Sequence, residues 1–125
     1  MNKPSGCVVR ASERGHAELR YGRGVVEQIV GPEVGAGRLD LHLNRIPAGS
    51  APGPYHLHPN AENVYLVVTG SLLVRIAREN HLLGPGDAAF VPAGVPHSAS
   101  NPGEVDVEVI EVYAPANPGF VEIEE

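Results

Sequence analysis

The chain has 125 residues, which is enough for one compact domain and too few for two of ordinary size. Its 15 glycines and 12 prolines exclude a mainly helical fold, because both residue types weaken helix interiors, and its 42% apolar residues exclude a disordered chain. The formal net charge of −6 argues against nucleic acids and anionic membrane surfaces as partners, because a negatively charged protein is repelled by both.

The single cysteine, Cys7, rules out an internal disulfide and a cysteine-rich zinc site. No apolar run of the kind found in a secretion signal follows Met1, and no stretch reaches the ~20 apolar residues that a membrane span needs. We therefore expect a cytoplasmic protein that does not cross a membrane.

The composition divides the chain into three segments. Residues 1–24 form a polar N-terminal arm that is interrupted by glycines, and residues 116–125 form an acidic C-terminal tail. Residues 25–115, between them, consist of short β-prone runs separated by glycine and proline turns, and this segment is expected to form the folded domain.

Strands are expected along the whole of the central segment. Residues 39–44 alternate leucine with polar residues, which predicts a half-buried strand; the alternation does not decide whether the polar face, with His42, lines the interior or meets solvent. The other predicted strands are residues 25–30, 63–68, 71–77, 81–83, 88–91, 95–100 and 105–113. Short strands at this spacing predict an all-β fold, either a sandwich or a barrel.

Three of the six histidines form a pattern that is typical of a metal site. His56 and His58 stand one residue apart, and in an extended chain both side chains project to the same face. His97 follows the proline- and glycine-rich turn at residues 92–96, which could present it from a neighbouring strand. Imidazole nitrogens suit Zn, Cu, Fe and Ni, so the pattern indicates a three-histidine site with open coordination positions.

The spacing of these histidines, together with the glycines and prolines around them, resembles the cupin superfamily, in particular its small single-domain members. The second cupin motif, G-x5-P-x-G-x2-H-x3-N, is matched at every fixed position by Gly86, Pro92, Gly94, His97 and Asn101. The first motif, G-x5-H-x-H-x3-4-E-x6-G, is matched at His56, His58 and Gly70, whereas Gly49 lies one residue too far upstream. The resemblance implies a double-stranded β-helix, or jelly-roll, barrel with a metal site near one open end.

At the fourth ligand position the sequence departs from the family motif. Counting back from Gly70 places Asn63 where the family has its metal-binding glutamate, whereas Glu62 satisfies the shorter permitted spacing from His58. Adjacent residues of a strand point to opposite faces, so only one of the two can face the metal unless the strand bulges. We favour Asn63 as a weak neutral ligand or a neighbouring polar group, and Glu62 is the alternative.

The resemblance covers dioxygenases, isomerases, decarboxylases and lyases, so it does not choose one reaction. We expect a metal-dependent enzyme of the oxygenase, isomerase or lyase type that acts on a small organic molecule through His56, His58 and His97. Its ion would be Fe, Mn, Ni or Zn, and Tyr65 and Glu62 are the candidate proton-transfer groups. The alternative is a non-catalytic cupin that binds a small ligand and has a structural metal or none.

A homodimer is also expected. A lone barrel of this size has edge strands to protect, and the N-terminal arm could pair with a second copy. Similar small cupins often dimerise through such arms, so the partners predicted are a small-molecule ligand or substrate and a second copy of the chain, without nucleic acid or membrane.

Overall fold

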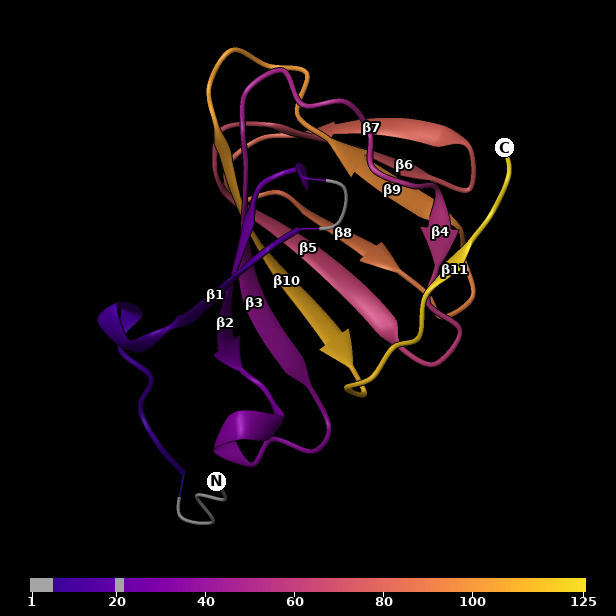
Figure 1. The fold of residues 1–125 in the computed structure, drawn as a ribbon. Helices are drawn as coiled ribbons and strands as arrows, with labels where there is room; N and C mark the ends of the chain where they lie inside the picture. The colour runs from indigo at the N-terminus through magenta and orange to yellow at the C-terminus, as the bar shows by residue number, and fades with distance from the viewer. Residues whose placement is uncertain (1–5, 20–21) are drawn as a thin grey trace.

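The computed structural model describes residues 6–19 and 22–125, which fold into two packed antiparallel β-sheets (Figure 1). The first sheet, in spatial order, contains β1 (Gly15–Glu18), β2 (Val25–Val30), β3 (Asp40–Ile46), β10 (Val107–Ala114), β5 (Glu62–Thr69) and β8 (Ala88–Val91). The second contains β11 (Val121–Glu122), β4 (His56–Leu57), β9 (His97–Ser100), β6 (Leu72–Ile76) and β7 (Glu79–Leu83). Two 3₁₀ turns, η1 (Ala11–Glu13) and η3 (Pro32–Val34), accompany the sheets in the described residues.

Strands that neighbour one another in space are often distant in the sequence, as a jelly roll requires. β10 lies between β3 and β5, and β4 pairs with β9. The predicted all-β, double-stranded β-helix fold is therefore confirmed. Alternation decides which side chains face the interior: in β5 the buried set is Asn63, Tyr65 and Val67.

Two strands lie in segments that the sequence analysis placed outside the folded domain. β1, in the predicted N-terminal arm, pairs with β2, and β11, in the predicted acidic tail, pairs with β4. Residues 1–5 and 20–21 of the arm lie outside the described residues. Within the described part of the chain, no helix has the length and apolar character needed to cross a membrane.

The hydrophobic core lies between the sheets and draws side chains from both. Its buried members are Ile46, Tyr65, Val67, Leu72, Val74, Leu83, Ala89, Val91, Ala99, Val107 and Val109. The closing glycine of the first motif, Gly70, has a φ of +78°, and a Cβ there would lie 2.6 Å from the carbonyl oxygen of Asp106. Both constraints explain why the turn after β5 carries a glycine.

The last residue of the second motif, Asn101, is fully buried and ties loops to the sheet. Its Nδ2 donates to the carbonyls of Ile46 (3.0 Å) and Val105 (2.9 Å), and its Oδ1 accepts from the backbone N–H of Gly103 (3.1 Å). Asn101→Ala would leave all three groups without this partner, and each unpaired buried group costs about 1–3 kcal/mol.

We therefore expect Asn101→Ala to lower the free energy of unfolding by about 2–4 kcal/mol in urea titrations followed by circular dichroism. Asn80→Ala is the matched control, because Asn80 is exposed and its Oδ1 accepts a hydrogen bond from Arg75 on the surface. The control should change the unfolding free energy by less than about 0.5 kcal/mol. Equal midpoints for the two variants would show that Asn101 has no such role.

Candidate metal centre

Three histidines converge where β4 pairs with β9. His56 in β4 lies directly opposite His97 in β9, and His58 follows β4 with its side chain on the same side as that of His56. Their ligand atoms all lie within 4.8 Å of one another, and the Nε2 atoms of His56 and His58 are 3.2 Å apart. All three side chains are buried, so the structure brings together the trio that the sequence spacing indicated.

Each ring is held through its Nδ1 by a backbone carbonyl. Nδ1 of His56 bonds to the Pro54 carbonyl (2.7 Å), that of His97 to the Val95 carbonyl (2.9 Å) and that of His58 to the Gly119 carbonyl (2.6 Å). A carbonyl oxygen only accepts, so in the neutral rings each Nδ1 carries the proton and each Nε2 keeps a lone pair. Three lone pairs therefore face one another.

The donor set fits a divalent metal ion. Nε2 of His97 is buried and has no hydrogen-bond partner among the described residues, and two neutral Nε2 acceptors at 3.2 Å cannot bond to each other. Metal-ligating histidines usually donate their other ring N–H to a carbonyl or carboxylate, as all three do here. His56, His58 and His97 are thus the residues that would hold the ion.

Burial keeps two of these rings in the neutral form that a metal ligand needs. Burial lowers the pKa of His56 to about 4, and outweighs the hydrogen bond to the Pro54 carbonyl that acts in the opposite direction. Burial likewise lowers the pKa of His97. At neutral pH both Nε2 atoms are consequently available as ligands.

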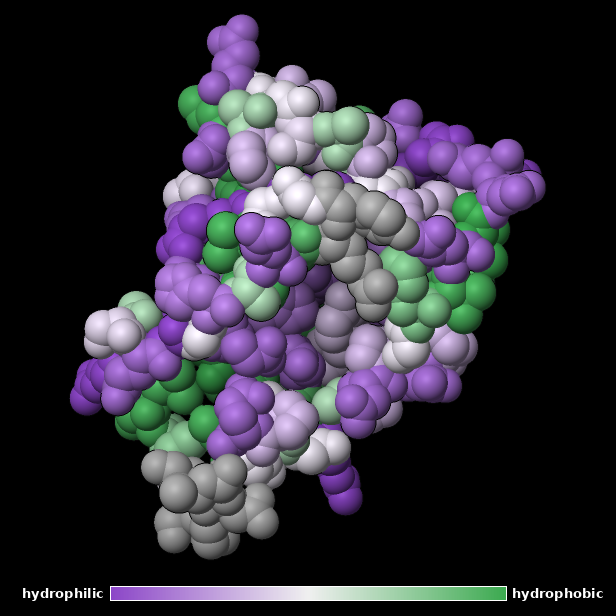
Figure 2. All heavy atoms as spheres, in the orientation of Figure 1, coloured by the Kyte–Doolittle hydropathy of each residue, from purple (hydrophilic) through white to green (hydrophobic). Residues whose placement is uncertain are grey.

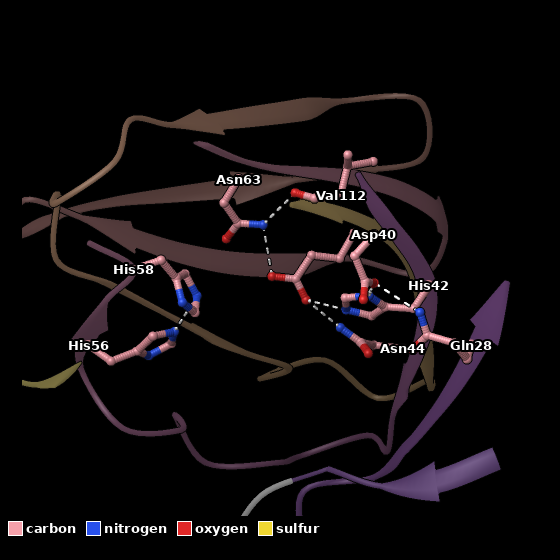
Figure 3. Close-up of polar contacts among 9 residues, drawn as sticks. Gln28, Asp40, His42, Asn44, His56, His58, Asn63 and Val112 are labelled. Atoms are coloured by element: carbon pink, nitrogen blue, oxygen red, sulfur yellow. Dashed lines mark hydrogen bonds and ion pairs between the residues drawn. The ribbon is translucent and has the colours of Figure 1, made fainter. Parts of the chain in front are cut away.

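Of the two residues proposed for the fourth position, Asn63 is buried and Glu62 is exposed. Nδ2 of Asn63 donates to the Glu111 carboxylate and to the Val112 carbonyl, both at 3.0 Å, which fixes the orientation of the amide. Its Oδ1 is buried and has no hydrogen-bond partner in the described part of the structure. Figure 3 shows this oxygen turned toward the side on which His58 lies.

A buried carboxylate that the sequence analysis did not single out lies beside Asn63. This is Glu111 of β10, whose Oε1 accepts from His42 (3.0 Å) and Asn44 (2.8 Å) and whose Oε2 accepts from Asn63. Nδ1 of His42 lies 2.9 Å from a carboxylate oxygen of Asp40. The alternation in the sequence did not decide whether the polar face of β3 points inward or to solvent. The structure shows that it lines the interior.

The carboxylate and His42 form a buried ion pair. Burial raises the pKa of Glu111, but the hydrogen bond and charge of His42, with the bonds from Asn63 and Asn44, outweigh it and hold the pKa at about 2. Burial lowers the pKa of His42, but the hydrogen bond and charge of Glu111 outweigh it and raise the pKa above its ordinary value. Glu111 is thus a charged group whose two oxygens are both occupied by donors.

A cavity of about 400 Å³ is lined by His56 and His58 and also by the two members of this buried pair. The face drawn in Figure 2 is hollowed near its centre, and hydrophilic residues border much of the hollow. Tyr65 lines the cavity with its ring 6.1 Å from that of His97; burial, followed by the charge of Glu111, raises the Tyr65 pKa well above its ordinary value. Tyr65 therefore keeps its proton, whereas Glu62 is not among the residues that line the cavity.

The C-terminal segment covers the histidines. The Phe120 ring stacks on His56 with centroids 4.6 Å apart and planes 23° apart, and the Gly119 carbonyl accepts from His58. Pairing of β11 with β4 holds this segment in place. No motif or periodicity in residues 116–125 indicates that they contribute to the site.

We expect a chain that ends at Asn117 to bind metal about 10–100-fold more weakly, because the carbonyl that fixes the His58 tautomer is lost. Phe120→Ala is the control, since it removes the stacked ring and keeps the carbonyl, and it should weaken binding less. Calorimetric titration of the metal-free proteins with Mn²⁺ and Zn²⁺ measures both. Unchanged affinity in the truncated chain would show that the Gly119 carbonyl does not support the site.

Comparisons with known proteins agree with this fold. The family described as "Cupin domain" matches residues 42–113. Germin-like protein 4-1 of Oryza sativa subsp. japonica is 32% identical over 120 residues, which cover 87% of this chain and 47% of the relative. Oxalate oxidase GF-2.8 of Triticum aestivum is 27% identical over 123 residues, which cover 90% of this chain and 54% of the relative. The chain thus spans about half the length of these curated relatives.

A solved structure shows the same architecture over nearly the whole chain. The polyketide cyclase RemF of Streptomyces resistomycificus has a TM-score of 0.82 to this chain at 19% sequence identity. The superposition covers 96% of this chain and 87% of that one, so the fold is shared along almost its full length.

Proposed function

The chain belongs to the cupin family, whose sequence profile matches more than half of it, and from this premise we propose that it is a metal-dependent enzyme for a small organic molecule. The observation that carries the proposal is the set of three buried Nε2 atoms within 4.8 Å, each freed by an Nδ1 bond to a carbonyl. When bound there, a divalent metal supplies Lewis acidity and open coordination positions.

The residues around the histidines have separable tasks in this proposal. Oδ1 of Asn63 is a buried acceptor with no hydrogen-bond partner among the described residues, and in this proposal it serves as a weak neutral ligand or as a hydrogen-bond acceptor beside the ion. Tyr65 keeps its proton and acts as a hydrogen-bond donor on the cavity wall. Glu111 orients Asn63 and is not proposed as a ligand, because its oxygens already accept hydrogen bonds from His42, Asn44 and Asn63.

The ion proposed is Fe, Mn, Ni or Zn, all of which accept imidazole ligands. The relatives do not choose the reaction, because one is named an oxalate oxidase and a structural neighbour is named a polyketide cyclase. We therefore propose the reaction only as a class, an oxygenase, isomerase or lyase reaction at the metal. Turnover assays separate these enzymes from a cupin that only binds a ligand.

We also propose that the chain forms a homodimer. The exposed face of the first sheet carries apolar side chains that a second copy would cover, among them Leu66, Val68 and Phe90, which are 40%, 45% and 55% exposed. Sedimentation velocity at micromolar concentration tests this proposal, and a monomer would contradict it.

The experiment that tests the function begins with metal content. Protein purified without chelator is analysed by inductively coupled plasma mass spectrometry, then stripped and titrated with Mn²⁺, Fe²⁺, Ni²⁺ and Zn²⁺. We expect about one ion per chain, as a single three-imidazole site allows. Oxygen uptake and product analysis with 1,3-dicarbonyls, thiols, phenols and carboxylic acids then test turnover. Bound metal without turnover would favour a ligand-binding cupin, and failure to bind any of the four ions would contradict a metal centre.

A further inference from the structure

One arginine in the cavity wall has a buried side-chain nitrogen without a hydrogen-bond partner among the described residues. Arg23 lines the cavity, is partly buried, and makes no ion pair among the described residues. Its Nε is buried and has no hydrogen-bond partner in the described part of the chain. A buried donor that is left unpaired is costly, so the arrangement is expected where a ligand completes it.

The chain makes room for this guanidinium at Gly53. A Cβ at position 53 would overlap the Arg23 guanidinium, with its Cζ, Nε and Nη1 as the nearest atoms. The φ of Gly53 does not lie in the left-handed region, so close approach of the arginine, and not backbone conformation, explains the glycine.

The excess of acidic residues in this chain makes an arginine without a carboxylate partner unexpected. The chain has 15 acidic and only 9 basic residues. Other arginines form ion pairs with these acidic residues: Arg14 and Arg45 pair with Glu27, and Arg75 pairs with Glu125. The cavity also contains Glu111, but its two oxygens are occupied by His42, Asn44 and Asn63. Arg23 is therefore the uncompensated charge among the described arginine and carboxylate side chains of the cavity wall.

We propose that the cavity binds an organic monocarboxylate with an apolar body, whose carboxylate pairs with the Arg23 guanidinium. The planar guanidinium matches a carboxylate through two parallel hydrogen bonds. One uncompensated positive charge matches a monoanion, whereas a phosphate dianion would add a second charge near Glu111. An apolar body fits the same cavity, because its lining includes the apolar and aromatic side chains of Leu19, Ile46, Tyr65, Ala99 and Phe120.

This inference names the substrate class of the proposed metal enzyme. That the acid is turned over rests on the proposed function, whereas binding of the acid does not. The acid therefore binds metal-free protein too. The probe is benzoate, with neutral benzamide as its matched analogue and inorganic phosphate as the competing anion. Calorimetric titration of the chelator-stripped wild type should show benzoate binding at least tenfold tighter than benzamide or phosphate.

Arg23→Gln should weaken benzoate binding at least tenfold and leave benzamide binding unchanged. Arg38→Gln is the matched control, since it makes the same charge change at an exposed position, and it should alter benzoate affinity less than twofold. Gly53→Ala keeps the arginine but displaces its guanidinium, so it should also weaken benzoate. Unfolding midpoints of the variants are measured beside the wild type, and Arg23→Lys, which keeps the charge without the planar fork, provides a second folded variant.

The outcomes distinguish this inference from the metal centre. Arg23-dependent benzoate binding in a protein that takes up no metal supports the acid site and overturns the enzyme proposal. Normal metal content together with benzoate affinity that Arg23→Gln or Arg23→Lys leaves unchanged overturns the acid site alone. Equal affinity for benzamide, or tighter binding of phosphate, also overturns the inference.

Discussion

His97→Ala should abolish metal binding while the protein stays folded. The substitution removes one of three imidazole ligands and, of the ring's own hydrogen bonds, only that to the Val95 carbonyl. We expect metal content to fall to background and affinity to fall by more than the roughly 10–100-fold that changes outside the ligand set cost. Plasma mass spectrometry of protein purified without chelator and calorimetric titration with Mn²⁺ and Zn²⁺ provide the two measurements.

His81→Ala is the matched control for this experiment, because His81 is an exposed histidine of β7 outside the cluster. It should bind metal as the wild type does. His56→Ala should behave like His97→Ala, since the two residues are paired across β4 and β9. Retention of metal in both cluster variants would place the ion elsewhere or show that it binds nonspecifically.

Metal removal offers an independent check on the same geometry. The Nε2 atoms of His56 and His58 lie 3.2 Å apart, and two neutral acceptors cannot bond to each other, so a bound ion would give both a partner. A metal that binds only the folded chain stabilises it by RT ln(1 + [L]/Kd), about 2.7 kcal/mol at a hundredfold excess over Kd. Added metal should thus raise the melting temperature of the wild type and of His81→Ala but not that of His97→Ala.

The histidines could be predicted from the sequence because two of them are related locally and the third lies at the spacing of a family motif. His-x-His in an extended segment places two rings on one face, and the turn before His97 fixes the third at motif spacing. The burial of Asn63 likewise follows from the count to Gly70, since that turn sets the register of β5. The relations of His56 to His58 and of Asn63 to Gly70 span only a few residues, whereas His97, opposite His56 across β4 and β9, is indicated by the resemblance to the cupin motif.

The remaining site residues depend on strand neighbours that no local pattern encodes. Glu111 follows Val107 and Val109 on the inward-facing side of β10. In the sequence alone, an acidic residue after two apolar ones suggests that the buried part of the strand has ended. Its role becomes visible only when β10 is placed beside β3, which brings His42 opposite it. The contacts of Phe120 and the position of Arg23 depend in the same way on the path of the chain ends across the barrel.

Glu111→Gln should lower the free energy of unfolding by about 3–5 kcal/mol, the cost of breaking a buried ion pair by removing one partner. The Glu111 carboxylate accepts hydrogen bonds from the side chains of His42, Asn44 and Asn63. A glutamine amide has one acceptor oxygen and two N–H donors, so at least one of these partners would face another donor. Urea titration of the metal-free proteins measures the loss.

Glu108→Gln makes the same change on the same strand at a partly exposed carboxylate that contacts Arg45 and Thr69 on the surface. It should cost no more than about 1 kcal/mol, as surface ion pairs do. A loss for Glu111→Gln no larger than for this control would mean that the buried pair contributes nothing beyond a surface one. Metal affinity should also fall in Glu111→Gln alone, because Asn63 loses the carboxylate that orients it.

The pH dependence of this difference identifies the ion pair as its cause. The pKa of Glu111 falls from its ordinary value of 4.5 to about 2, so its stabilisation is complete above pH 4.5 and is lost as the pH falls toward 2. The pKa of His42 is raised above 6.5, so its stabilisation is complete below pH 6.5 and is lost as the pH rises through the folded-state pKa. The difference between wild type and Glu111→Gln should therefore be largest between about pH 4.5 and 6.5 and shrink on both sides. A difference that did not shrink either below about pH 4.5 or as the pH rises well above 6.5 would point to packing, and not charge, as the contribution of Glu111.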